Sequence, residues 1–160
     1  MRGYRACAGA LLVVWALLQT GCASEDWRFK SFDEIGYDLL WQSIIDVLQY
    51  KGGYAIAEEK PVEGTIETRW KDSLVPFSRG GYRQRAFVKV DREEGGRSFL
   101  VGIRVEKELN VSMNDPLDPE GKDWSRASDD SLEAQILLQH LDTLLGGHEG
   151  SPIVRLEVLR

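Results

Sequence analysis

Cysteine and histidine are scarce in this chain, and their scarcity limits the chemistry that it can carry. Among its 160 residues only Cys7, Cys22, His140 and His148 are of these types. They form neither an HExxH nor a paired-cysteine spacing, so the two histidines are a weak ligand pair for a metal. The serines also lack the GxSxG setting of a nucleophile elbow. We therefore expect no metal, no cofactor and no enzyme activity, with a Ser–His–Asp set as the remaining catalytic alternative.

An excess of basic residues is also missing. The chain has 20 Lys and Arg against 26 Asp and Glu, a formal charge of −6. Residues 1–21 hold Arg2 and Arg5 and no acid, so the rest carries 18 basic and 26 acidic residues, or −8. Because phosphate binding needs a basic surface, this balance excludes nucleic acid as the expected partner. With 42% apolar and 29% charged residues, the composition is that of one ordinary globular domain.

The hydrophobic run near the N-terminus is too short for a membrane span. It covers residues 6–18, whereas a transmembrane helix needs about 20 residues. Arg2 and Arg5 precede it, and small and polar residues follow as far as Gly21. This is the layout of a secretory signal, so residues 1–21 are predicted to be a removable leader. If Cys7 leaves with it, the one remaining thiol cannot form an intramolecular disulfide.

Cys22 stands where the hydrophobicity ends, in the stretch "LLQTGCAS". Gly21-Cys22 resembles the lipobox of bacterial lipoproteins, in which the thiol receives a diacylglyceryl group before the leader is cut off in front of it. The resemblance implies lipidation of Cys22, and several acyl chains would hold the protein firmly on a membrane. The residue after the cysteine is Ala23 and not Asp, a pattern that resembles the default sorting of lipoproteins to the outer membrane. Which face of that membrane the protein would occupy is left open. The alternatives are an ordinary signal with a chance cysteine and an uncleaved anchor.

Residues 22–31 are then expected to be the lipidated cysteine and a short tether, followed by a single domain over 32–160. Trp27 to Lys30, "WRFK", mixes aromatic and basic side chains. Such side chains suit lipid headgroups; the alternative is that Trp27 and Phe29 simply pack on the domain.

Two helical patterns flank a run of strand patterns. Tyr37, Trp41, Ile44, Ile45 and Leu48 share one helical face, with Asp33 as a cap and Gly52-Gly53 as the end. The second helix would bury the stripe formed by Leu132, Ile136, Leu137, Leu141 and Leu144, with Ser128 or Asp129 as its cap and Gly146-Gly147 as its end.

Between the helices the apolar period changes to two. "YAIAEE" predicts a short strand, and a second strand sets Gly64, Ile66, Thr68 and Trp70 on one face. Two longer strands follow, with apolar faces formed by Ala86, Val88 and Val90 and by Phe99, Val101, Ile103 and Val105. Their other faces are mostly charged, and "PIVRLEVLR" adds a strand through Val154, Leu156 and Val158 that nothing in the sequence places. We predict an α+β fold: a two-layer antiparallel sheet of about four to five strands with two helices packed on one face.

Residues 34–107 carry a family resemblance. The aromatic-bearing helix, "GYAIAEEKPVEGTIETRW" and "RQRAFVKVDREEGGRSFLVGIRVEKE" resemble the helix-grip domain of the BamC-like (NlpB-like) lipoproteins of the outer-membrane assembly complex. The resemblance implies a helix-grip fold and a non-enzymatic domain of the cell envelope.

Three groups of side chains are candidate sites. One is a cationic stripe that could bind an acidic partner or lipid phosphates, or could pair with the domain's own acids: Arg79, Arg83, Arg85 and Lys89. The second could line a pocket between helices and sheet, or could be ordinary core: Tyr37, Trp41, Trp70 and Phe99. The third is the acidic loop Asp115 to Asp123, which does not fit an EF-hand but leaves an irregular calcium site as an alternative to a solvated loop.

These observations favour a lipid-anchored envelope protein whose domain binds another protein as a scaffold or assembly accessory. The alternative is a module that binds a small apolar molecule or lipid in a cavity beneath the helices.

Overall fold

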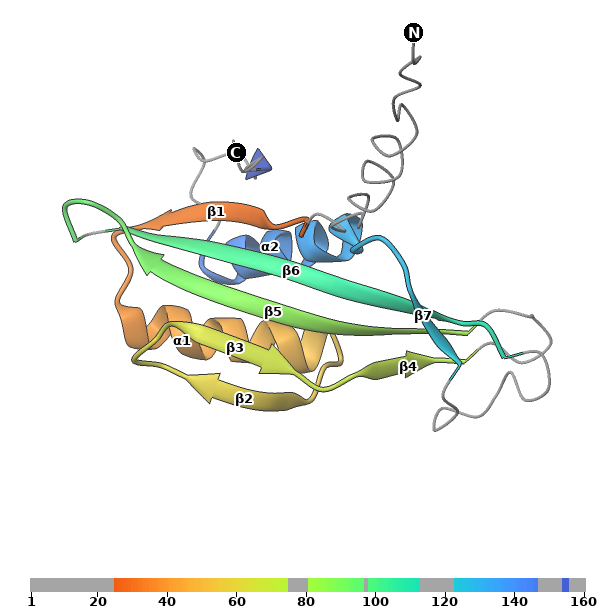
Figure 1. The fold of residues 1–160 in the computed structure, drawn as a ribbon. Helices are drawn as coiled ribbons and strands as arrows, with labels where there is room; N and C mark the ends of the chain where they lie inside the picture. Colours follow the sequence, from red (N-terminus) through yellow and green to blue (C-terminus); the bar gives the residue numbers. More distant parts are fainter. Residues whose placement is uncertain (1–24, 75–80, 97, 113–122, 147–153, 156–160) are drawn as a thin grey trace, which may run out of the picture.

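The sheet dominates the domain, and its two longest strands run side by side along its full length (Figure 1). The computed structural model describes residues 25–74, 81–96, 98–112, 123–146 and 154–155. In the described residues every strand pairing is antiparallel, and the strands form one eight-stranded sheet with the main order β2-β3-β5-β6-β1-β8. Two short strands lie off this path: β4 pairs with β5, and β7 pairs with β6.

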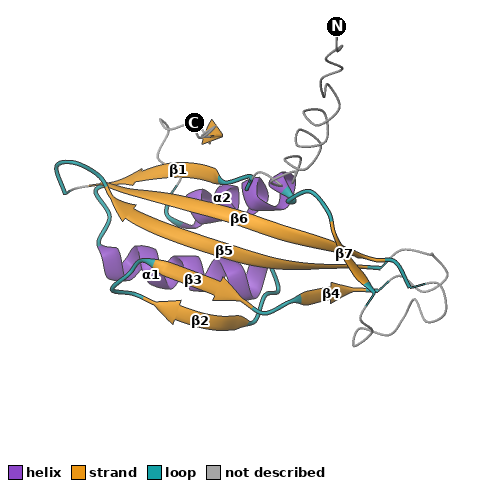
Figure 2. Cartoon of the chain, in the orientation of Figure 1, coloured by secondary structure: helices purple, strands orange, loops and turns teal. Residues whose placement is uncertain are grey.

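The strands are β1 (Arg28–Asp33), β2 (Ile56–Lys60), β3 (Thr65–Thr68), β4 (Lys71–Ser73), β5 (Tyr82–Arg92), β6 (Ser98–Asn110), β7 (Trp124–Arg126) and β8 (Val154–Arg155). The helices are α1 (Tyr37–Asp46), which continues as the π-helical turn η2 (Val47–Lys51), and α2 (Ser131–Leu144). Both helices lie on the same side of the sheet (Figure 2). The predicted α+β class is confirmed. The expected four or five strands were too few, because β1 and the short strands β4 and β7 were not recognised.

The apolar alternation of β5 and β6 produces the core. Ala86 and Val88 from β5 and Val101, Ile103 and Val105 from β6 are almost completely buried beneath the helices. The helices contribute Leu40, Trp41, Ile44, Val47 and Leu48, then Ala134, Leu137, Leu138 and Leu141. The backbone turn before β3 fits closely on this layer: Gly64 has a positive φ, and its carbonyl accepts a hydrogen bond from the Val90 amide.

The first helix begins later than its sequence pattern predicts. Asp33 was expected to cap it, but Asp33 is the last residue of β1, and the helix starts at Tyr37 after Gly36, which makes no side-chain cap. The predicted end is right, because η2 ends at Lys51, directly before Gly52-Gly53.

The second helix is rotated relative to the predicted stripe. Leu137 and Leu141 are buried as expected, whereas Leu132 and Leu144 are mostly exposed and Ile136 lies at the border. Ala134 and Leu138 take their places in the core. The cap is Asp130, whose side chain accepts a hydrogen bond from the Glu133 amide; neither Ser128 nor Asp129 is the capping residue.

The segment predicted as a tether is partly folded. Residues 28–31, its last four, form the first part of β1, which lies between β6 and β8 in the sheet. β8 holds Val154 opposite Phe29, which places the C-terminal strand that the sequence left unplaced; Leu156 and Val158 lie outside the described residues. Among the helices that the structure describes, none is long and apolar enough to cross a membrane.

Candidate functional site

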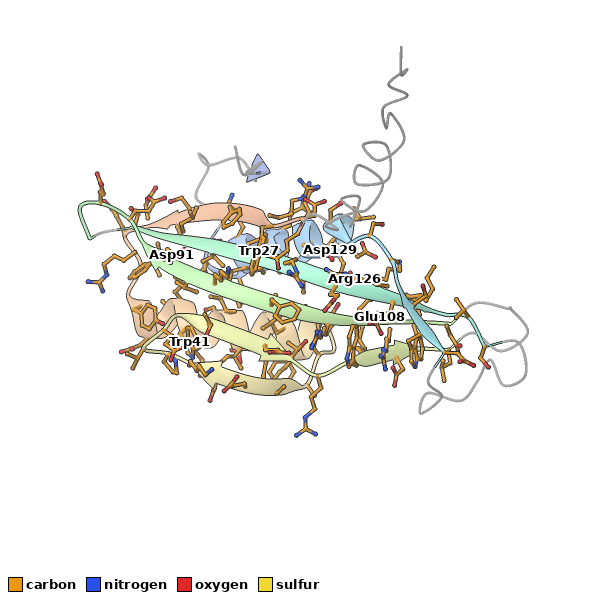
Figure 3. The ribbon with its side chains drawn as sticks, in the orientation of Figure 1. Trp27, Trp41, Asp91, Glu108, Arg126 and Asp129 are labelled. Carbon is orange, nitrogen blue, oxygen red and sulfur yellow. The ribbon has the colours of Figure 1, made fainter. Side chains whose placement is uncertain are left out.

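The face of the sheet that points away from the helices carries a row of arginines stacked on aromatic rings. Side chains at alternate positions of β5 and β6 meet there in cross-strand pairs, with Arg83 opposite Glu108, Arg85 opposite Glu106 and Phe87 opposite Arg104. Because strand side chains alternate between faces, this row is a direct consequence of the same alternation that buries Ala86 and Val88. We call this face the arginine–tryptophan face, and Figure 3 shows its position on the near side of the ribbon.

Arg83 lies between two tryptophans. Its guanidinium centre is 4.5 Å from the ring centroid of Trp70 and 4.6 Å from that of Trp124. Its Nε donates to Glu108 Oε2 at 2.7 Å. A cation held by two rings and a carboxylate loses most of its rotamer freedom before any partner arrives.

Arg85 continues the row with two carboxylates. Its Nε donates to Glu106 Oε2 at 2.7 Å and its NH1 donates to Glu67 Oε1 at 2.9 Å. Its guanidinium also stacks on Trp70 and Phe87, at 4.7 and 4.8 Å from their centroids. The domain therefore supplies the acids that balance this arginine.

Arg104 and Glu106 lie on the charged face of β6, yet both side chains are buried. Their exposed fractions are 7% and 6%. Arg104 contacts Glu25 at 2.5 Å and Asp129 at 3.6 Å, and it lies 4.7 Å from the centroid of Phe87. Glu25 belongs to the N-terminal segment and Asp129 to the turn before α2, so residues that are distant in sequence cover the Arg104 side chain.

The N-terminal segment is fixed on this face by several contacts. The Trp27 indole donates to Glu25 Oε2 at 2.9 Å, and the Asp26 amide donates to Asp129 Oδ2 at 2.9 Å. The Lys89 ammonium lies 4.4 Å from the Trp27 ring centroid. The hydrogen bond from Trp27, with Arg104 nearby, lowers the pKa of Glu25 below its ordinary value, although partial burial opposes the shift.

The predicted cationic stripe is thus present in part. Arg83, Arg85 and Lys89 lie on the same face as expected, and the two arginines pair with the domain's own acids. Arg79 lies outside the described residues. Sequence reasoning missed Arg104, Trp27 and Trp124 as members of this face; the charged partners Glu106 and Glu108, at period two on β6, were the signal that could have found the pairs.

The predicted pocket residues are not all brought together. Tyr37 lies with its ring 5.7 Å from Trp41 and 5.5 Å from Phe99, between ring centroids. Trp70 instead stacks on Arg83 and Arg85, on the opposite face of the sheet. Trp41 is 8% exposed and belongs to the packed core.

A surface hollow of about 320 Å³ does include two of these four residues. Tyr37 and Phe99 line it together with the β2–β3 turn and the ends of β5 and β6. It lies beside the start of α1, and the Tyr37 hydroxyl donates to the Pro61 carbonyl at its edge.

The remaining predicted sites are not described or not clustered. Cys22, His148 and residues 115–122 of the acidic loop lie outside the described residues, and His140 is an exposed residue of α2. In the described part of the chain, no group of three or more His, Cys, Asp or Glu side chains is arranged to hold a metal ion.

No protein-family model matches this chain, and no curated protein is significantly similar to it in sequence.

Proposed function

We propose that this protein is a lipid-anchored, non-enzymatic docking module of the bacterial cell envelope, held on the outer membrane through Cys22 and binding a protein partner with its arginine–tryptophan face. The observation that carries the docking role is the placement of Arg83 between Trp70 and Trp124, on the sheet face opposite the two described helices. The lipid anchor is supported by the leader pattern that ends at Gly21-Cys22.

Tryptophan and arginine are the residue types that dominate the binding energy of protein–protein interfaces. Here they are already immobilised, since Glu108 and Glu106 hold the guanidinium groups of Arg83 and Arg85. Binding would therefore cost little side-chain entropy, which favours recognition by a rigid surface. The partner would contact the aromatic faces and the outward guanidinium edges. Net charge would contribute less to binding, because Glu106 and Glu108 balance the charges of the two arginines.

We assign no catalytic residue, because the acidic and basic side chains of this face form ion pairs with one another. The BamC-like resemblance of residues 34–107 makes a component of the outer-membrane assembly complex the first partner to test. The alternative function is the binding of an apolar ligand beneath the helices. The geometry does not support it, because two of the expected pocket residues, Trp70 and Trp41, lie on different sides of the sheet.

Site-specific photo-crosslinking in intact cells of the source organism tests the docking role. The crosslinker replaces Asp72, which is exposed and opposite Arg83 in the β4–β5 pair, and, as a control, Gln139 on the exposed side of α2. We expect a discrete protein adduct from position 72 that is absent from position 139.

The interface is then disturbed without removing the internal ion pair. The charge swap Arg83→Glu with Glu108→Arg keeps opposite charges facing each other across β5 and β6, so the fold should persist. It moves the cation away from its place between the two tryptophans, so the adduct should disappear. Adducts that form equally from both positions, or that survive the swap, would contradict docking on this face.

A further inference from the structure

The chain enters the fold almost immediately after Cys22. Glu25 contacts Arg104, Asp26 contacts Asp129, and Trp27 packs beside Lys89. Three residue steps separate Cys22 from Glu25, and an extended chain covers at most about 3.6 Å per residue, so the two Cα atoms lie within about 11 Å of each other. Trp27 lies within about 18 Å of the same cysteine by this limit. An acylated Cys22 would therefore hold this corner of the domain at the headgroup layer.

A groove opens at that corner, on the arginine–tryptophan face. Its volume is about 330 Å³, and it lies between the N-terminal segment, β5 and the β2–β3 hairpin. The residues that matter for recognition are Trp27, Glu58, Lys60, Glu67, Phe87 and Lys89.

The groove presents both signs of charge around aromatic surface. Lys60 and Glu58 are 3.1 Å apart and largely exposed. Across the groove the exposed Lys89 lies over Trp27, and Glu67, whose Oε1 accepts from Arg85, adds a second carboxylate. Ammonium groups bind a phosphate, carboxylates bind an ammonium, and indole rings favour the boundary between headgroups and acyl chains.

We propose that this groove receives a zwitterionic phospholipid headgroup, with its phosphate at Lys89 and Lys60 and its ammonium at Glu58 and Glu67, and so orients the domain on the bilayer. This inference rests on the proposed lipid anchor at Cys22, which brings the groove within reach of the lipid. A purely anionic headgroup would fit less well, because it has no ammonium group to place beside Glu58 and Glu67.

The docking end of the face remains outside this contact. Arg83 lies six residues along β5 from Lys89, and a strand rises about 3.4 Å per residue, which separates the two by about 20 Å. The Trp27 end thus meets lipid, and the Trp70–Trp124 end stays available for a protein.

The test uses the full chain, acylated in a two-membrane bacterium and reconstituted into vesicles of phosphatidylethanolamine and phosphatidylcholine. A nitroxide is placed at Asp91→Cys, two residues along β5 from Lys89, or at Gln135→Cys on α2; both positions are exposed. With Cys22 acylated and the leader removed, the introduced cysteine is the one free thiol. Collisional access of a water-soluble nickel chelate to each label is compared with access in detergent.

We expect access to the Asp91 label to fall about threefold or more on reconstitution, as for a site in the headgroup layer, while access to the Gln135 label stays unchanged. Lys89→Glu should abolish the difference, whereas the matched charge change Lys51→Glu, on the exposed end of η2, should preserve it. Unchanged access to the Asp91 label on reconstitution, in a chain whose mass shows acylation, would overturn the headgroup site. Shielding of the Asp91 label in phosphatidylglycerol vesicles that is as strong as in the zwitterionic vesicles would also overturn it. A chain whose mass shows no acyl groups would instead overturn the proposed anchor, so the two failures are distinguishable.

Discussion

The ring of Phe29 lies directly on Gly102, its partner across the β1–β6 pair. A Cβ atom on Gly102 would stand 2.6 Å from Cε1 of Phe29, far inside van der Waals contact. The glycine is therefore what allows β1 to pair with β6 in this register, with the Phe29 ring over position 102.

This relationship gives a test of the folded N-terminal segment. Gly102→Ala should lower the free energy of unfolding by about 1–3 kcal/mol, as overpacking does, measured by urea denaturation. Gly36→Ala is the matched control, because a Cβ there meets no atom within 4 Å. Equal stability of the two variants would show that Phe29 does not pack on Gly102.

Arg104 should be among the costliest charged residues to remove. Arg104→Met leaves Glu106 and Asp129 with a buried charge that has lost a partner, and breaking such a buried pair costs about 3–5 kcal/mol. Arg126→Met is the comparison, because its side chain is 46% exposed and its contact with Glu106 is 3.6 Å; it should cost less than about 1 kcal/mol. Chemical denaturation of both variants at neutral pH measures the two losses, and equal losses would contradict the burial of Arg104 among its acidic partners.

The pH dependence of the unfolding free energy should reflect the ionisation of Asp130. Burial raises the pKa of this carboxyl, but the hydrogen bond from the Glu133 amide and the contacts with Lys107 and Gln84 outweigh it, so its pKa is lowered in the folded state. A carboxyl with a depressed folded pKa stabilises the fold above its unfolded pKa, and this contribution is lost as the pH falls through the folded pKa.

Asp130→Asn keeps an N-cap acceptor and removes the charge. The difference in unfolding free energy between the parent chain and this variant should be largest near pH 7 and should shrink below about pH 4. Urea denaturation across this range measures it. A difference that stays constant from pH 7 to pH 3 would mean that the charge of Asp130 does not contribute.

The sequence predicts the regular parts of this fold because local periodicity and burial agree there. Ala86, Val88 and Val90 alternate as expected, and the glycine pair at 52–53 ends the first helix. The alternation fails to reveal β1 because Lys30, on its inward face, is buried against Asp142 of α2, with 3.2 Å between Nζ and Oδ2. A lysine at a core position cannot be recognised until its acidic partner is placed by the fold.

The position of Trp70 shows a second limit. It continues the period-two pattern of Ile66 and Thr68, and so it was expected on the core face. However, β3 ends at Thr68 and β4 begins at Lys71, and this break shifts the alternation by one residue. Thr68 is buried, and its hydroxyl accepts a hydrogen bond from the Ala86 amide at 2.8 Å. Trp70 lies on the other face, where its ring stacks on Arg83 and Arg85. A break of two residues carries no signal in the hydrophobic pattern.

The sequence predicts the arginine stripe from its spacing and offers pairing with the domain's own acids as one alternative, but it does not identify those acids. Glu106 and Glu108 had the correct period, and only the register of β5 and β6 shows that they face Arg85 and Arg83. Trp27 and Trp124 join the row from segments that are distant in sequence, so their role depends on tertiary structure alone.

The central claim is that a lipid on Cys22 holds a folded domain against a membrane, and intact-mass analysis of the protein purified from native membranes tests it most directly. We predict a chain that begins at Cys22, lacks residues 1–21 and carries the added mass of a diacylglyceryl group, which the Cys22→Ser variant lacks. An unmodified Cys22 thiol, or a chain that retains its leader, would contradict the account.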